Sequence, residues 1–140
     1  MSEYETDALA WSEEQAALLR RMASGETTVT PDWANIIEEI ETVGLNSLRA
    51  CRSLLIQALA HDLKAAAWPN THYVSRWRHD AETFRIEARE VFTPSMRQRL
   101  DLDAIYRRAL RELPDTIDGA APLPAPPECP ATLDELLGLD

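Results

Sequence analysis

The chain has 140 residues, with 24 acidic against 14 basic side chains, and so a formal net charge of −10. A composition of 45% hydrophobic and 27% charged residues excludes an intrinsically disordered chain. The acidity disfavours nucleic-acid binding without excluding it, and no apolar run is long enough to cross a membrane. The N-terminus is acidic where a secretion signal would be basic, so we expect a cytoplasmic protein.

Charge is unevenly distributed along the chain. Residues 1–44 hold ten acids and two bases (−8), residues 45–113 hold eight acids and twelve bases (+4), and residues 114–140 hold six acids and no base (−6). The acidic ends can neutralise the basic middle within the fold or between subunits. The basic segment 45–113 is therefore where we first look for a partner-binding surface.

Apolar residues repeat at helical spacing along nearly the whole chain, and no segment alternates as a strand does. The pattern predicts a single all-α domain over residues 1–140, a compact bundle of four to five helices. The first helix is expected over 7–22. The next covers 31–67 and starts at a marked cap, Thr30-Pro31-Asp32. Its first half carries an apolar stripe typical of a core-facing helix: Trp33, Ile36, Ile37, Ile40 and Val43.

Gly44 leaves two alternatives open for this region, because it either ends one helix or lies inside a longer one. Further core helices are expected over 75–92 and 102–113. Residues 114–130 hold six of the nine prolines, which predicts an extended strap on the bundle or a mobile tail. A short last helix is expected over 132–137.

A metal site is one candidate for chemistry in a helical bundle. Glu38 and Glu41 are three residues apart, and His61 would approach them from the following helix if residues 31–67 broke near 44. The helical wheel places Glu38 opposite the isoleucine stripe, so a solvated glutamate is the stronger interpretation. The sequence contains no phosphate loop or nucleophile motif, and we predict no cofactor.

Two charged residues, Arg52 and Asp62, fall inside the apolar arc of the 45–68 region. A buried charge needs a partner, since desolvating it alone costs several kcal/mol. Ten residues separate the two, so each is expected to pair with another helix, and Asp62 with an arginine such as Arg107 or Arg78. A ladder of charged residues spaced three or four apart in the 75–92 helix is expected to be solvated: Arg78, Glu82, Arg85 and Arg89.

Several stretches together resemble a known family. They are Trp11-Ser-Glu-Glu-Gln-Ala-Ala-Leu-Leu-Arg20, Ile37-Glu-Glu-Ile-Glu-Thr-Val-Gly44, His61-Asp-Leu-Lys64, Ser75-Arg-Trp77 and Glu128-Cys-Pro-Ala-Thr-Leu-Asp-Glu-Leu-Leu137. Their order and spacing resemble bacterial domain-of-unknown-function family 29 over essentially the whole chain. The resemblance implies a short, all-helical bacterial protein and no established activity. It departs at Asp62, where an apolar residue is expected. Candidate binding residues match the recurring positions of the family: Glu38, Glu39, His61, Lys64 and Trp77.

The leading hypothesis is a non-enzymatic protein-interaction or oligomerisation module, because no catalytic constellation is present and the charge is strongly segregated. The alternative is a small metal-binding protein or enzyme with a site near Glu38, Glu41 and His61. A third hypothesis is nucleic-acid binding through segment 45–113, where arginines alternate with aromatic residues around Trp77. Whether the protein is an enzyme stays open at this point.

Overall fold

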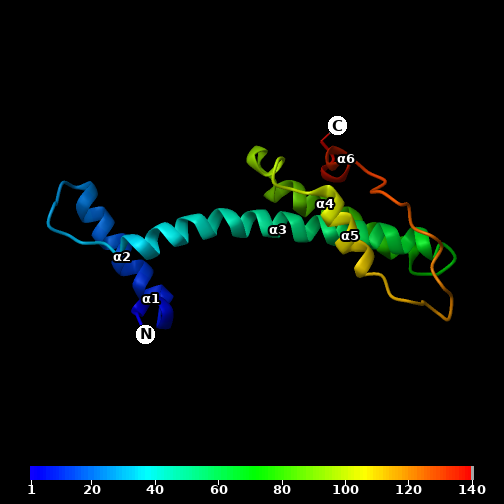
Figure 1. Ribbon diagram of the computed structural model, residues 1–140, viewed down its shortest axis with the longest axis horizontal. Coiled ribbons are helices and arrows are strands. Elements are labelled where there is room, and N and C mark those ends of the chain that lie inside the picture. Colours follow the sequence, from blue (N-terminus) through cyan, green and yellow to red (C-terminus); the bar gives the residue numbers. More distant parts are fainter. Residues whose placement is uncertain (140) are drawn as a thin grey trace. The chain divides into compact units, whose positions relative to one another are not determined.

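The computed structural model describes residues 1–139, which contain six α-helices, one 3-10 turn and no strand (Figure 1). The all-α prediction is confirmed. Asp140, the last residue of the predicted domain, lies outside the described residues. The helices are α1 (Glu3–Thr6), α2 (Ala8–Ala23), α3 (Trp33–Ala67), α4 (Val74–Val91), α5 (Leu102–Arg111) and α6 (Leu133–Leu137), with the 3-10 turn η1 at Pro94–Met96.

The chain separates into two compact units, and the division falls between Leu45 and Asn46. Unit 1 is Met1–Leu45, and unit 2 begins at Asn46. The single-domain organisation stays a prediction.

Helix α3 runs without a break from Trp33 to Ala67, so Gly44 lies inside one long helix. Gly44 does not adopt the positive φ of a helix-terminating glycine, unlike Gly25 and Gly138. A glycine inside a helix costs about 1 kcal/mol relative to alanine.

Polar contacts around Asp32 hold the helices of unit 1 together. The indole Nε1 of Trp11 on α2 donates to the Asp32 carboxylate at 3.0 Å, and Gln15 Oε1 accepts from the Asp32 backbone N–H at 2.7 Å. Trp11 and Gln15 are both buried. These contacts fix the start of α3 against α2, and Asp32 also accepts from Asn35 at 2.7 Å.

Helix α1 was not predicted from the sequence. It is one turn long, and the Glu5 carboxylate caps it by accepting from the backbone N–H of Ser2 at 3.0 Å. Tyr4 packs edge-on against Trp11, with 4.7 Å between ring centroids. A helix this short shows no apolar periodicity, so the pattern in the sequence could not reveal it.

The core of unit 2 is built from the second half of α3 with α4, η1, α5 and α6 (Figure 1). Leu55 on α3 and Ile105 on α5 are fully buried, and Leu137 brings α6 into the same cluster. Helix α6 is further fixed by an ion pair of 2.7 Å between Asp134 and Arg97.

The proline-rich segment follows α5 and is tied to the core helices at several points. Its Leu123 backbone N–H donates to the carbonyl of Ala67 at 3.0 Å, and the Trp68 indole donates to the carbonyl of Ala120 at 2.9 Å. Tyr106 on α5 donates its hydroxyl hydrogen to the carbonyl of Pro126. The segment therefore lies as a strap on unit 2.

Candidate functional site

The first half of α3 exposes most of the apolar stripe that we expected in a core. Of the five side chains, only Ile36 is buried. The other four are exposed by 49% at Trp33, 53% at Ile37, 69% at Ile40 and 65% at Val43. The core-facing prediction is wrong for these four residues. Amphipathic spacing identifies an apolar face, but it does not say whether another element covers it.

The exposed residues form one continuous face. Their spacings of three and four residues match the 3.6-residue turn, so they lie above one another on the same side of α3. Scattered single hydrophobic residues are normal on a protein surface, but a contiguous row marks an interaction site. We call Trp33, Ile37, Ile40 and Val43 the α3 seam.

Helix α3 carries three glutamates along the length of the seam, and they differ in their surroundings. Glu39 and Glu41 flank the seam, whereas Glu38 lies on the opposite side of the helix. Glu38 and Glu41 are exposed, whereas Glu39 is half-buried and accepts a hydrogen bond from the Tyr4 hydroxyl. That hydrogen bond, helped by desolvation and by the negative charge of Glu39, raises the pKa of Tyr4 to about 12. Glu39 is thus committed to holding α1, while Glu38 and Glu41 face solvent.

The charge of Asp32 is stabilised in the native state. Hydrogen bonds from Asn35 and then from Trp11 lower the pKa of this carboxyl group, outweighing the opposing effect of desolvation. Asp32 therefore stays ionised at the junction of α2 and α3 and keeps the start of the seam in a fixed position.

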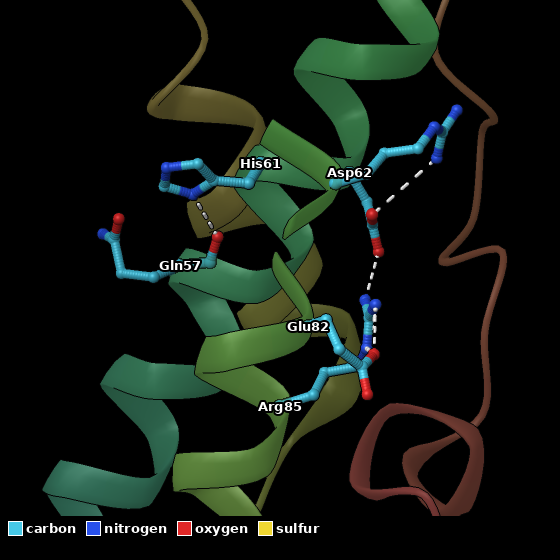
Figure 2. Close-up of polar contacts among 6 residues, drawn as sticks. Gln57, His61, Asp62, Glu82 and Arg85 are labelled. Carbon is cyan, nitrogen blue, oxygen red and sulfur yellow. Dashed lines mark hydrogen bonds and ion pairs between the residues drawn. The ribbon is translucent and has the colours of Figure 1, made fainter. Parts of the chain in front are cut away.

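Asp62 in unit 2 is half-buried and belongs to an ion-pair cluster (Figure 2). The Arg85 guanidinium lies 2.5 Å from the Asp62 carboxylate and also contacts Glu82 at 2.8 Å. Arg78 lies farther from Asp62, at 3.9 Å. The pairing with Arg78 occurs as expected, but the main partner is Arg85, which the pattern in the sequence did not indicate.

Arg85 was expected to lie on a solvated face, yet its side chain is mostly buried. Burial alone would lower the pKa of its guanidinium, but hydrogen bonds and negative charge from Glu82 and Asp62 outweigh burial and raise the pKa. The spacing of three residues between Glu82 and Arg85 was the available signal. The prediction that Arg52 is buried is wrong, because Arg52 is exposed on α3. The helical wheel cannot tell which part of an apolar arc other helices cover.

The predicted metal ligands do not all belong to one unit. Glu38 and Glu41 belong to unit 1, whereas His61 belongs to unit 2. The His61 Nδ1 contacts the carbonyl oxygen of Gln57 at 2.7 Å, and Figure 2 shows its ring directed away from Asp62. Among residues 1–139, no group of three or more His, Cys, Asp or Glu side chains is placed to hold a metal ion.

The five candidate binding residues are likewise spread along the chain. Glu38 and Glu39 belong to unit 1. His61, Lys64 and Trp77 belong to unit 2, where all three are half-buried. His61 packs on Phe84, with 5.2 Å between ring centroids, and Trp77 lies beside Tyr73 at 5.6 Å. Packing against neighbouring aromatic rings therefore accounts for the positions of His61 and Trp77.

Unit 2 also has an open, mostly apolar cavity of about 480 Å³ at the end of α3. Trp68, His72 and Leu123 contribute to its walls, and Asp118 lies at the turn of the strap beside it. Asp118 and Gly119 both have positive φ, which suits an Asp-Gly turn closed by mutual hydrogen bonds between Ile117 and Ala120. The Asp-Gly turn explains the positive φ of both residues, so no ligand is needed to account for it.

The comparisons with known proteins agree with this fold. The family model "Domain of unknown function DUF29" matches residues 3–140, so the chain belongs to that family. A crystal structure of an alpha-helical protein of unknown function from Rhodospirillum rubrum is similar, with 27% identity and a TM-score of 0.69. The match covers 100% of this chain and 93% of that one. A comparison with curated proteins finds no match.

A helix that spans a membrane must be both long and predominantly apolar. In residues 1–139, no helix combines the length and the apolar character needed to cross a bilayer.

Proposed function

We propose that this protein is a protein-association module that uses the α3 seam to bind a helix of another protein chain. The observation that carries the proposal is the row of four large apolar side chains, each about half exposed or more, on one face of α3. Leaving such a row in water is unfavourable, because each side chain gains roughly 1.5–3 kcal/mol on full burial. A helix that covers the seam recovers part of that free energy.

Helix pairing fits the seam better than ligand binding does. A small-molecule site is concave, whereas the seam lies along the exposed side of a single helix. Amphipathic helices are commonly recognised through anchors at spacings of three and four residues. The seam lies in acidic unit 1, not in the basic segment 45–113 where we first looked for a partner surface.

Substitution of one seam residue tests the proposal against a matched control. Ile40→Ser removes an exposed anchor, and Ile86→Ser removes an exposed isoleucine of α4, which lies in unit 2. We expect the Ile40 variant to lose the proteins that the wild type captures from a lysate of its source organism. The Ile86 variant should keep them.

Sedimentation of the purified proteins, measured in parallel, reports self-association. The proposal fails if the wild type is monomeric and captures nothing, or if both variants retain every interaction of the wild type. Thermal unfolding should change little in either variant, because both isoleucines are exposed.

A further inference from the structure

We infer that the partner of the α3 seam is a basic amphipathic helix from a different protein, with lysine or arginine beside its apolar face. This inference rests on the proposed function and adds the chemistry of the partner. It is carried by the charges that surround the seam.

The seam has the geometry of a short coiled-coil interface. Trp33, Ile37 and Ile40 are followed by Gly44, so the spacings alternate as four, three and four residues. This alternation is the a and d pattern that pairs two helices. A Cβ atom placed on Gly44 would meet no heavy atom within 4 Å. The glycine therefore leaves room at the end of the seam for a large side chain of the partner.

The rim of the seam is acidic and has no basic side chain of its own. Between Arg21 and Arg49 the chain has no lysine, arginine or histidine, but it has five carboxylates. Glu41 flanks the seam, whereas Glu38 lies on the opposite side of α3. Both are exposed, and neither forms an ion pair within residues 1–139. The Glu41 carboxylate is thus available to a partner at the rim, and Glu38 adds to the negative charge of this part of α3.

Charge decides between a basic partner and a second copy of this chain. Residues 1–45 carry a net charge of −8, from ten acids and two bases, so two copies that joined their seams would bring like charges together. Such repulsion opposes association across the Debye length, about 8 Å at physiological salt. A basic helix instead gains attraction at the rim and burial at the seam.

The size of the seam sets the expected strength of the complex. The exposed parts of its four side chains amount to on the order of 400 Å² on this chain, at the low end of specific interfaces. We therefore expect micromolar affinity and rapid exchange. An interface of this size suits a reversible contact rather than a permanent assembly.

The experiment uses the full-length protein and two fluorescent synthetic peptides of about 18 residues. Both peptides have leucine at a and d positions. One carries lysine and arginine at the flanking positions, and its twin carries glutamate there. Fluorescence anisotropy measures their binding to the wild type and to three variants.

We expect the basic peptide to bind the wild type and the acidic twin not to bind. Ile37→Ser combined with Ile40→Ser should weaken binding at least about thirtyfold, because two central anchors are lost. Glu41→Gln should weaken it about threefold, as expected for one rim charge. The matched control is Glu90→Gln, an exposed glutamate of α4, and it should bind like the wild type. High salt should weaken the complex.

Several results would overturn the inference. Equal binding of both peptides would show that the rim charges do not select the partner, and the seam would still be a protein-binding surface. Self-association of the wild type through Ile40, strengthened by salt, would identify a second copy as the occupant. In both cases the proposed function stands and the basic partner does not. Unchanged binding of the basic peptide to the Ile37 and Ile40 variant would mean general charge attraction, which also refutes the inference.

Discussion

The two halves of helix α3 carry apolar faces of similar make-up but differ in what covers them. In unit 2, Cys51, Leu55 and Ala58 are completely buried beneath other helices. In unit 1, Ile37 and Ile40 are more than half exposed. A single helix thus serves as a core element along one part and presents a free apolar surface along another. Burial depends on the neighbours that the rest of the chain supplies.

The two units also differ in how they are held together. Unit 2 has a continuous cluster of buried aliphatic and aromatic side chains. Unit 1 relies more on a few polar contacts, chiefly those of Trp11 and Gln15 with Asp32 and of Tyr4 with Glu39. The first arrangement supports a stable scaffold, and the second leaves an apolar face available for binding.

The largest expected effect comes from removing a core side chain of α3 in unit 2. Leu55→Ala should lower the free energy of unfolding by about 2–5 kcal/mol, because it removes buried contacts and leaves a cavity. Ile40→Ala, on the exposed seam, should change it by less than about 0.5 kcal/mol. Urea denaturation followed by circular dichroism measures both. Equal losses would show that the seam is covered within the native protein.

A smaller effect is expected from the ion-pair cluster of unit 2. Asp62→Asn should cost about 1 kcal/mol, because it weakens a charge-assisted hydrogen bond to the mostly buried Arg85. Arg52→Ala provides the comparison, since Arg52 is exposed and should change stability by less than about 0.5 kcal/mol. The same denaturation assay applies. A greater loss of stability from the Arg52 variant would contradict the finding that Asp62 is paired and Arg52 is exposed.

Gly44→Ala should stabilise the protein by roughly 0.5–1 kcal/mol, because alanine favours the helix and its Cβ meets open space. Thermal unfolding measures this gain. The same substitution should weaken binding of the basic peptide, since the added methyl group fills the space left for the partner. A more stable variant with unchanged peptide affinity would remove Gly44 from the binding surface.

The smallest expected effect is a pH dependence in unit 1. The pKa of Tyr4 is raised to about 12 in the folded protein, from about 10 in the unfolded chain. The folded state therefore holds this proton more tightly, and its contribution to stability is complete below pH 10 and lost as the pH rises towards 12. The difference in melting temperature between the wild type and Tyr4→Phe should shrink over that range. If the difference in melting temperature stayed constant over that range, the stability of the protein would not depend on the Tyr4 hydroxyl proton.

Much of the secondary structure could be predicted because the periodicity is strong in the long helices. The bounds of α2, α3, α4, α5 and α6 lie within two residues of the predicted ranges. Residues that start a helical turn, such as the capping Asp101 before α5 and the first proline of η1, act locally and so leave a signal in the sequence. Helix α1 was missed because a single turn carries no periodic signal.

The candidate site was harder to predict. The sequence singled out the residues of the seam, yet it assigned them to a core, because a buried face and a binding face have the same amphipathic pattern. It also identified Asp62 as a charge in need of a partner, but not Arg85 as the main one. The pairing depends on how α4 packs on α3 within unit 2.

The charge distribution and the helical spacing of the sequence by themselves establish an acidic, all-α protein with a strongly acidic N-terminal third. Both are local or additive properties that do not depend on contacts between distant residues. Only the tertiary structure decided that Gly44 lies within one helix and which parts of α3 are covered. Burial is a property of pairs of surfaces, so it is fixed when distant segments pack and not by the spacing within one segment.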